Sequence, residues 1–213
     1  MTTYFIKTVF RSTAGIAVSV LTDETAADFL VSEELWPLGR VKPGDKITED
    51  QFSELEHSAL LSRALARTKE ILYYSPHSRA GLLQKLRHHG MPDEIAEEAA
   101  DWAVRRGLIR EEEQALLAAE TYHRRKYWGR KRIAAELIHR GYEHGIVQAA
   151  VESVPDEEYL SALIMIIEKK FKEVPTDPAE RQKMVLSLLR IGYTGGEIKD
   201  AIARVAQKEE SLV

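Results

Sequence analysis

The side chains best suited to chemistry or to binding are concentrated in one stretch of this 213-residue chain, residues 122–132, called here the basic–aromatic segment. Arginine and lysine neutralise phosphates, and aromatic rings stack on bases or on the side chains of a protein partner. The segment therefore predicts contact with a protein partner or a nucleic acid. The candidate contact residues are Tyr122, Arg124, Arg125, Lys126, Trp128, Arg130, Lys131 and Arg132. The alternative is a solvated basic face where two helices meet, with Trp128 or Tyr127 in the core.

Other residue types that support catalysis or metal binding lack the necessary spacing. A helical metal site needs two histidines at i and i+4, and no pair among the seven histidines has that spacing. The acidic runs at 111–113 and 156–158 each begin an expected helix, where carboxylates favour the positive end of the helix dipole. Neither a Gly-Lys-Ser/Thr phosphate loop nor a Gly-x-Ser-x-Gly elbow occurs. We expect no enzyme, no cofactor and no metal.

The composition is that of a folded protein, with 44% hydrophobic and 30% charged residues and no cysteine. The absence of cysteine excludes disulfides and thiolate metal sites, and it suits a reducing compartment. The N-terminus lacks a secretory signal, and the most apolar stretch, 160–167, is far shorter than a membrane span of about 20 residues. We therefore expect a cytoplasmic protein without membrane contact.

The net charge of −4 is unevenly distributed. Residues 1–60 carry 5 Lys/Arg against 10 Asp/Glu, a balance of −5, whereas residues 121–142 carry 7 against 1, a balance of +6. The overall charge argues against a general nucleic-acid coat protein. The local positive charge keeps contact with a polyanion open.

Three segments of the chain share a pattern that indicates an internal repeat. Each has a Leu, three further residues and a Gly, followed by an Ile that begins a short apolar helix; the segments are 86–95, 137–146 and 188–198. The glycines, at 90, 141 and 192, are 51 residues apart in both steps. Glycine after a helix takes the left-handed C′ position at little steric cost, so each unit is expected to close a helix there.

Each repeat is interpreted as a long first helix followed by two short ones. The first helices are expected at 50–74, 110–127 and 156–171, the second at 79–88, 130–139 and 179–190, and the third at 93–106, 144–153 and 195–206. Breaks are expected at Ser75-Pro76, Gly107, Trp128-Gly129, Pro155 and Glu173-Val-Pro175. Caps are expected at Thr48, Ser78, Asp177 and Thr194, and Pro92 suits the start of a helix.

Residues 1–47 have a different pattern, with apolar and β-branched runs at 4–10, 16–21 and 27–31 that predict short strands. The residues between them, 11–15 and 22–25, are turn-like. The predicted fold is therefore mainly α, with three tandem three-helix repeats in an elongated, curved array and a small N-terminal β cap. The expected domains are 1–47, 48–107, 108–154 and 155–213.

The set of repeat residues resembles the RecX family, bacterial regulators of the RecA recombinase. The resemblance covers roughly residues 60–205 and is carried by the run 78–86, Gly107-Leu-Ile-Arg-Glu-Glu112, Gly129-Arg-Lys-Arg-Ile-Ala-Ala-Glu-Leu137 and Gly192-Tyr193. Pro43-Gly-Asp before a long helix is similar to the β-capped members.

The resemblance implies a regulator without catalytic residues that binds the RecA filament on single-stranded DNA. It implies modulation, with inhibition expected, of ATP hydrolysis, strand exchange and filament stability, and so regulation of DNA repair, recombination and the SOS response. The protein would contact single-stranded DNA directly or through RecA. We expect it to be a monomer. The alternative is a stand-alone helical DNA-binding protein, because short helices joined at a glycine superficially resemble helix-turn-helix units.

Overall fold

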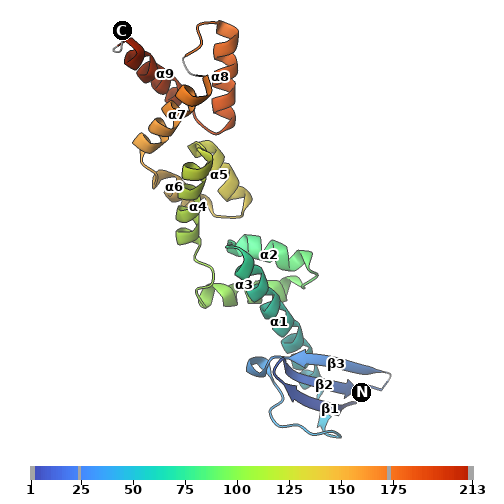
Figure 1. Cartoon of the computed structure of the whole chain (residues 1–213). Helices are drawn as coiled ribbons and strands as arrows, with labels where there is room; N and C mark the ends of the chain where they lie inside the picture. The colour runs from blue at the N-terminus through green and yellow to red at the C-terminus, as the bar shows by residue number, and fades with distance from the viewer. Residues whose placement is uncertain (1–2, 24, 172–173, 211–213) are drawn as a thin grey trace. The chain divides into compact units, whose positions relative to one another are not determined.

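The computed structural model describes residues 3–23, 25–171 and 174–210, and it divides into two units that meet between Ile109 and Arg110 (Figure 1). The first unit contains a sheet and helices α1–α3, and the second contains α4–α9. The predicted turn at 22–25 includes Glu24, and the predicted break at 173–175 includes Glu173; both residues lie outside the described part of the chain.

The sheet of the first unit is antiparallel, with strand order β3-β2-β1-β4. Its strands are β1 (Tyr4–Ser12), β2 (Gly15–Leu21), β3 (Ala26–Val31) and β4 (Lys46–Ile47). The three predicted strands are confirmed, but β1 continues through Arg11 and Ser12, which we had expected in the turn. The short β4 and a 3₁₀ helix at Glu33–Leu35 were not predicted.

One face of this sheet packs on the first helix and forms a small core. Ile6, Val18, Val20, Val31 and Ile47 are buried there against Leu55 of α1 (Glu49–Tyr74). The helix begins at the expected capping box, in which the Thr48 side chain accepts from the Gln51 amide and the Gln51 side chain accepts from the Thr48 amide. The β cap is therefore joined to the first repeat by a shared apolar core.

The helices fall into three repeats of three, as predicted. In every repeat the third helix packs against both the first and the second. The remaining bounds are α2 (Arg79–His88), α3 (Asp93–Arg105), α4 (Glu111–Lys126), α5 (Arg130–His139), α6 (His144–Glu152), α7 (Asp156–Phe171), α8 (Pro178–Arg190) and α9 (Gly195–Glu210). Most ends agree with the prediction within two residues, and α9 extends four residues further. The four-part domain division stays a prediction.

The repeated Leu-x-x-x-Gly pattern closes the second helix of each repeat in the same way. Gly90, Gly141 and Gly192 have φ of 74°, 85° and 99°, the left-handed conformation in which glycine avoids a Cβ clash. The amide of the residue after each glycine donates to the carbonyl of the repeat leucine, at 3.1, 3.1 and 3.3 Å. All three leucines are fully buried. The pattern is thus a Schellman motif whose leucine anchors the repeat core.

Helix starts also follow local sequence signals. The Ser78 and Asp177 side chains accept from the amides of Gly81 and Glu180, both at 2.9 Å, as predicted. The expected break at Trp128-Gly129 is confirmed, and the left-handed residue that ends α4 is Tyr127, with φ of 52°. None of the helices in the described part of the chain combines the length and apolar character needed to span a membrane.

Candidate functional site

The basic–aromatic segment comprises the end of α4, the loop 127–129 and the first turn of α5; Tyr122 and Trp128 pack inward, whereas Tyr127 is 39% exposed. Tyr122 is 7% exposed, and its ring lies 5.1 Å from the partly buried Trp128 ring. Burial raises the pKa of Tyr122. The Tyr122 ring is thus part of the core of the second repeat, and its expected contact with a partner stays an untested prediction. Trp128 is partly buried against the same core.

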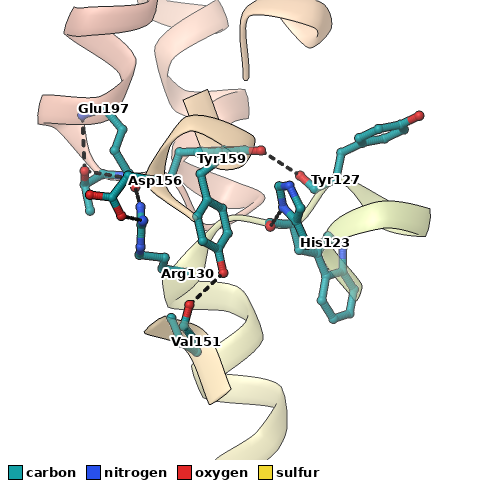
Figure 2. Close-up of polar contacts among 10 residues, drawn as sticks. His123, Tyr127, Arg130, Val151, Asp156, Tyr159 and Glu197 are labelled. Carbon is teal, nitrogen blue, oxygen red and sulfur yellow. Dashed lines mark hydrogen bonds and ion pairs between the residues drawn. The ribbon is translucent and has the colours of Figure 1, made fainter. Parts of the chain in front are cut away.

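His123 was not assigned a role from sequence, and the structure places it between the second and third repeats. Its side chain is 4% exposed, its Nδ1 lies 3.3 Å from the Trp128 carbonyl oxygen, and its ring packs edge-on against Tyr159 of α7 at 4.5 Å (Figure 2). The Tyr159 hydroxyl donates to the Val151 carbonyl at 3.2 Å. Burial raises the pKa of Tyr159 from 10.0 to about 12, so its hydroxyl keeps its proton further into the alkaline range than an exposed tyrosine does.

Arg130 is also used inside the protein. Its guanidinium forms ion pairs with Asp156 of α7 and Glu197 of α9, and it lies 4.0 Å from the centre of the Tyr159 ring (Figure 2). Only a quarter of the side chain is exposed. Glu197 in turn accepts from the amide of Thr194, at 2.7 Å, in the predicted capping box. Arg130 therefore ties the second repeat to the third, and its expected role as a contact residue stays a prediction.

The backbone completes this junction. The Gly129 amide donates to the Ile191 carbonyl at 2.8 Å, and the Lys131 amide donates to the Gly192 carbonyl at 3.1 Å. The first amides of α5 thus satisfy carbonyls left free at the end of α8, and the two helix dipoles meet with opposite ends. A Cβ on Gly129 would lie 2.5 Å from the Gly192 backbone. Two glycines 63 positions apart are needed for this approach, and neither local sequence signals it.

Two further contacts hold the same junction. The Tyr193 hydroxyl donates to the Tyr127 carbonyl at 3.2 Å (Figure 2). Arg132 Nη1 donates to the Arg190 carbonyl at 3.2 Å. Tyr193 is fully buried, and burial raises its pKa. The basic–aromatic segment thus serves first as the connection between the second and third repeats, which the residues alone did not indicate.

Five cations of the segment still reach solvent and are called here the cationic surface: Arg124, Arg125, Lys126, Lys131 and Arg132. The Lys126 and Arg132 charges lie 4.2 and 4.4 Å from the centre of the Trp128 ring, so one indole positions both. Arg124 pairs with Glu120 at 2.8 Å. In the described part of the chain, Arg125 and Lys131 have no ion-pair partner, which leaves both charges available to a ligand.

The surface is less positive on the side that faces α7. Arg124 and Tyr127 line a shallow depression of about 410 Å³ whose opposite wall carries Glu157 and Glu158. These carboxylates would repel a phosphate close to Arg124. The part of the cationic surface best suited to an anion therefore lies around Lys126, Lys131 and Arg132. No group of three or more metal-ligating side chains occurs among the residues described.

Comparison with known proteins agrees with this architecture. The family model for the third three-helix domain of RecX matches residues 156–202, which span α7, α8 and the first half of α9. The regulatory protein RecX of Pseudomonas syringae pv. tomato is 33% identical over 132 residues, covering 61% of this chain and 84% of that protein. The chain belongs to the RecX family.

Other members support the assignment over a longer stretch. The regulatory protein RecX of Caldanaerobacter subterraneus is 27% identical over 172 residues, or 80% of this chain. A crystal structure of a regulatory protein RecX has a TM-score of 0.74 with 19% identity and covers 92% of this chain and 99% of its own. RecX from Lactobacillus salivarius has a TM-score of 0.63 with 18% identity and covers 70% of this chain and 97% of its own. At these identities the solved structures establish the fold alone.

Proposed function

We propose that this protein binds the RecA filament on single-stranded DNA and inhibits its ATP hydrolysis, strand exchange and persistence, so regulating DNA repair and recombination. Membership of a family of regulatory proteins is the observation that carries the proposal. The protein would act in the cytoplasm, as a monomer and without a cofactor.

The architecture of the second unit suits a binding role. Its two repeats are locked by backbone hydrogen bonds at Gly129 and by the ion pairs of Arg130. A locked pair of repeats presents the cationic surface in a fixed arrangement, which reduces the conformational entropy lost on binding. Cations held in place around an indole can meet the phosphates of DNA within a filament or the acidic side chains of the filament protein.

The direct test is the rate of ATP hydrolysis by RecA on single-stranded DNA, measured while this protein is titrated up to an amount equal to RecA. We expect the rate to fall. An unchanged rate and an unchanged filament lifetime would contradict the proposal.

The contribution of the cationic surface is tested with Arg125→Glu/Lys131→Glu, because neither side chain makes an ion pair with any residue that the structure describes. The matched control is Arg181→Glu/Lys199→Glu, which changes the net charge equally at exposed positions of α8 and α9. If both side chains contact phosphates, the first variant should bind filaments more weakly, with a salt slope reduced by about 2. Equal binding by both variants would mean that the cationic surface is a solvated face.

The stand-alone DNA-binding alternative differs in one measurement. Tight binding to duplex DNA without RecA, with a steep dependence on salt, would favour that alternative. The proposed regulator should instead need the filament for tight binding.

A further inference from the structure

Two adjacent tyrosines at the end of α1 are left uncovered. Tyr73 is 85% exposed and Tyr74 is 78% exposed, the highest values among the large hydrophobic side chains of the described residues. Their rings contact each other edge to face at 5.5 Å. Neither ring contributes to the core of the first repeat, so packing does not explain why two aromatic residues stand here. Exposed rings of this kind are typical of surfaces that bind a ligand or a partner.

Basic and histidine side chains of the first repeat lie beside Tyr74. A depression of about 240 Å³ is lined by Tyr74, Arg67 of α1, Lys85 of α2, and His77 and His89 near the two ends of α2. A second depression, of about 470 Å³, shares Arg67 and His89 and adds Arg63. The two depressions therefore form one continuous basic region along the first repeat.

The charge of this surface is positive at neutral pH. Among the residues that line the two depressions, Glu70 is the one carboxylate, and Arg67 pairs with it at 2.5 Å. The other Arg67 nitrogen, Nη2, lies 2.7 Å from His89 Nε2. Desolvation lowers the pKa of His89, and the charges of Arg67, His88 and Lys85 lower it further. The positive charge of the surface is therefore carried by Arg63, Arg67 and Lys85.

We propose that this surface, called here the tyrosine-pair surface (Arg67, Tyr73, Tyr74, Lys85 and His89), binds a segment of single-stranded nucleic acid. Bases stack on the exposed tyrosine rings, and the backbone phosphates lie against Arg67 and Lys85. Duplex DNA is disfavoured, because paired bases do not offer their faces to a ring. The biological setting rests on the proposed function, in which the protein meets single-stranded DNA, but the site itself is defined without RecA.

The test uses the full chain without RecA and a fluorescently labelled oligothymidine strand of about 15 nucleotides, with binding followed by anisotropy. Tyr73→Ala/Tyr74→Ala should weaken binding by about tenfold or more. The matched control is Phe10→Ala, which removes another exposed aromatic ring, 68% exposed, from the sheet. This control variant should bind the strand as tightly as wild type. A labelled duplex of the same length should bind the wild-type protein more weakly than the single strand does.

Lys85→Glu should also weaken binding, whereas Lys199→Glu, an equal charge change on α9, should not. A strand containing 5-bromouracil, irradiated with the wild-type protein, should cross-link to the peptide that carries Tyr73 and Tyr74. This measurement does not depend on the folding of any variant.

The proposal is overturned if the tyrosine variant binds the strand as tightly as wild type, if duplex binds equally well, or if cross-links fall solely on residues 122–132. If the Tyr73→Ala/Tyr74→Ala variant loses strand binding but still inhibits ATP hydrolysis by RecA as wild type does, both proposals stand. If the wild-type protein binds the strand through the tyrosine pair but does not change ATP hydrolysis by RecA, only the proposed function is contradicted.

Discussion

The substitution Gly129→Ala tests the junction between the second and third repeats. Gly129 has φ of −78°, which alanine adopts without strain, so the backbone conformation itself is not the obstacle. The obstacle is space, because the new Cβ would lie 2.5 Å from the carbonyl carbon and oxygen of Gly192 and 2.6 Å from the Tyr193 amide nitrogen. All three are backbone atoms, which cannot rotate away, so α5 and α8 must separate.

The cost follows from the contacts that separation would break. Two backbone hydrogen bonds, from Gly129 to Ile191 and from Lys131 to Gly192, contribute about 1 kcal/mol each. Strain from the added methyl group adds about 1–3 kcal/mol. The free energy of unfolding should therefore fall by about 3–5 kcal/mol.

Urea denaturation followed by circular dichroism measures this change, and amide hydrogen exchange localises it. The Lys131 amide should lose protection, whereas the Tyr142 amide, bonded to Leu137 within the second repeat, should keep it. The control is Gly145→Ala in α6, where no heavy atom lies within 4 Å of the new Cβ. That variant should be as stable as wild type or up to about 1 kcal/mol more stable. A Gly129→Ala midpoint equal to that of wild type would refute the close approach of the two helices.

Three other substitutions or conditions test the repeats. Leu137→Ala, at a fully buried position, should destabilise the protein by about 2–5 kcal/mol, and an unchanged melting temperature would show that the repeat register is wrong. Gly141→Val forces a branched residue to φ of 85° and should cost about 1–2 kcal/mol or more in urea unfolding; a neutral result would argue against the left-handed cap. Because the pKa of Tyr159 is raised to about 12 in the folded protein from 10.0, the folded state retains a proton that the unfolded state releases, so stability should fall as pH rises from about 10 to 12. Tyr159→Phe should show a shallower fall over this range, and an identical pH profile would contradict the burial of that hydroxyl.

Much of the fold follows from local sequence, because helix ends carry their own chemistry. The glycines at 90, 141 and 192 and the caps at Ser78 and Asp177 gave helix bounds that the structure confirms. The two-residue strand β4 escaped prediction because its pairing partners, Tyr4 and Phe5, lie about forty positions away. Local preference cannot specify so short a strand.

The candidate site was predicted less well. The residue types singled out the basic–aromatic segment, but they do not say which of its side chains face the core and which face solvent. Arg130 is held by Asp156 and Glu197, which are 26 and 67 positions away, and Tyr122 is covered by the core of its own repeat. These pairings arise only when the third repeat packs against the second. Tyr73 and Tyr74 were not predicted as a site, because the sequence does not show whether two tyrosines at the end of a helix are buried or exposed.

The most direct measurement for the account as a whole is co-sedimentation with RecA filaments. The protein is centrifuged with RecA in the presence and absence of single-stranded DNA and ATP, and the pelleted fraction is compared. If the protein is a filament regulator, it should pellet when RecA, DNA and ATP are all present and remain in the supernatant when DNA or ATP is omitted. A pelleted fraction that is the same with and without filaments would contradict the account.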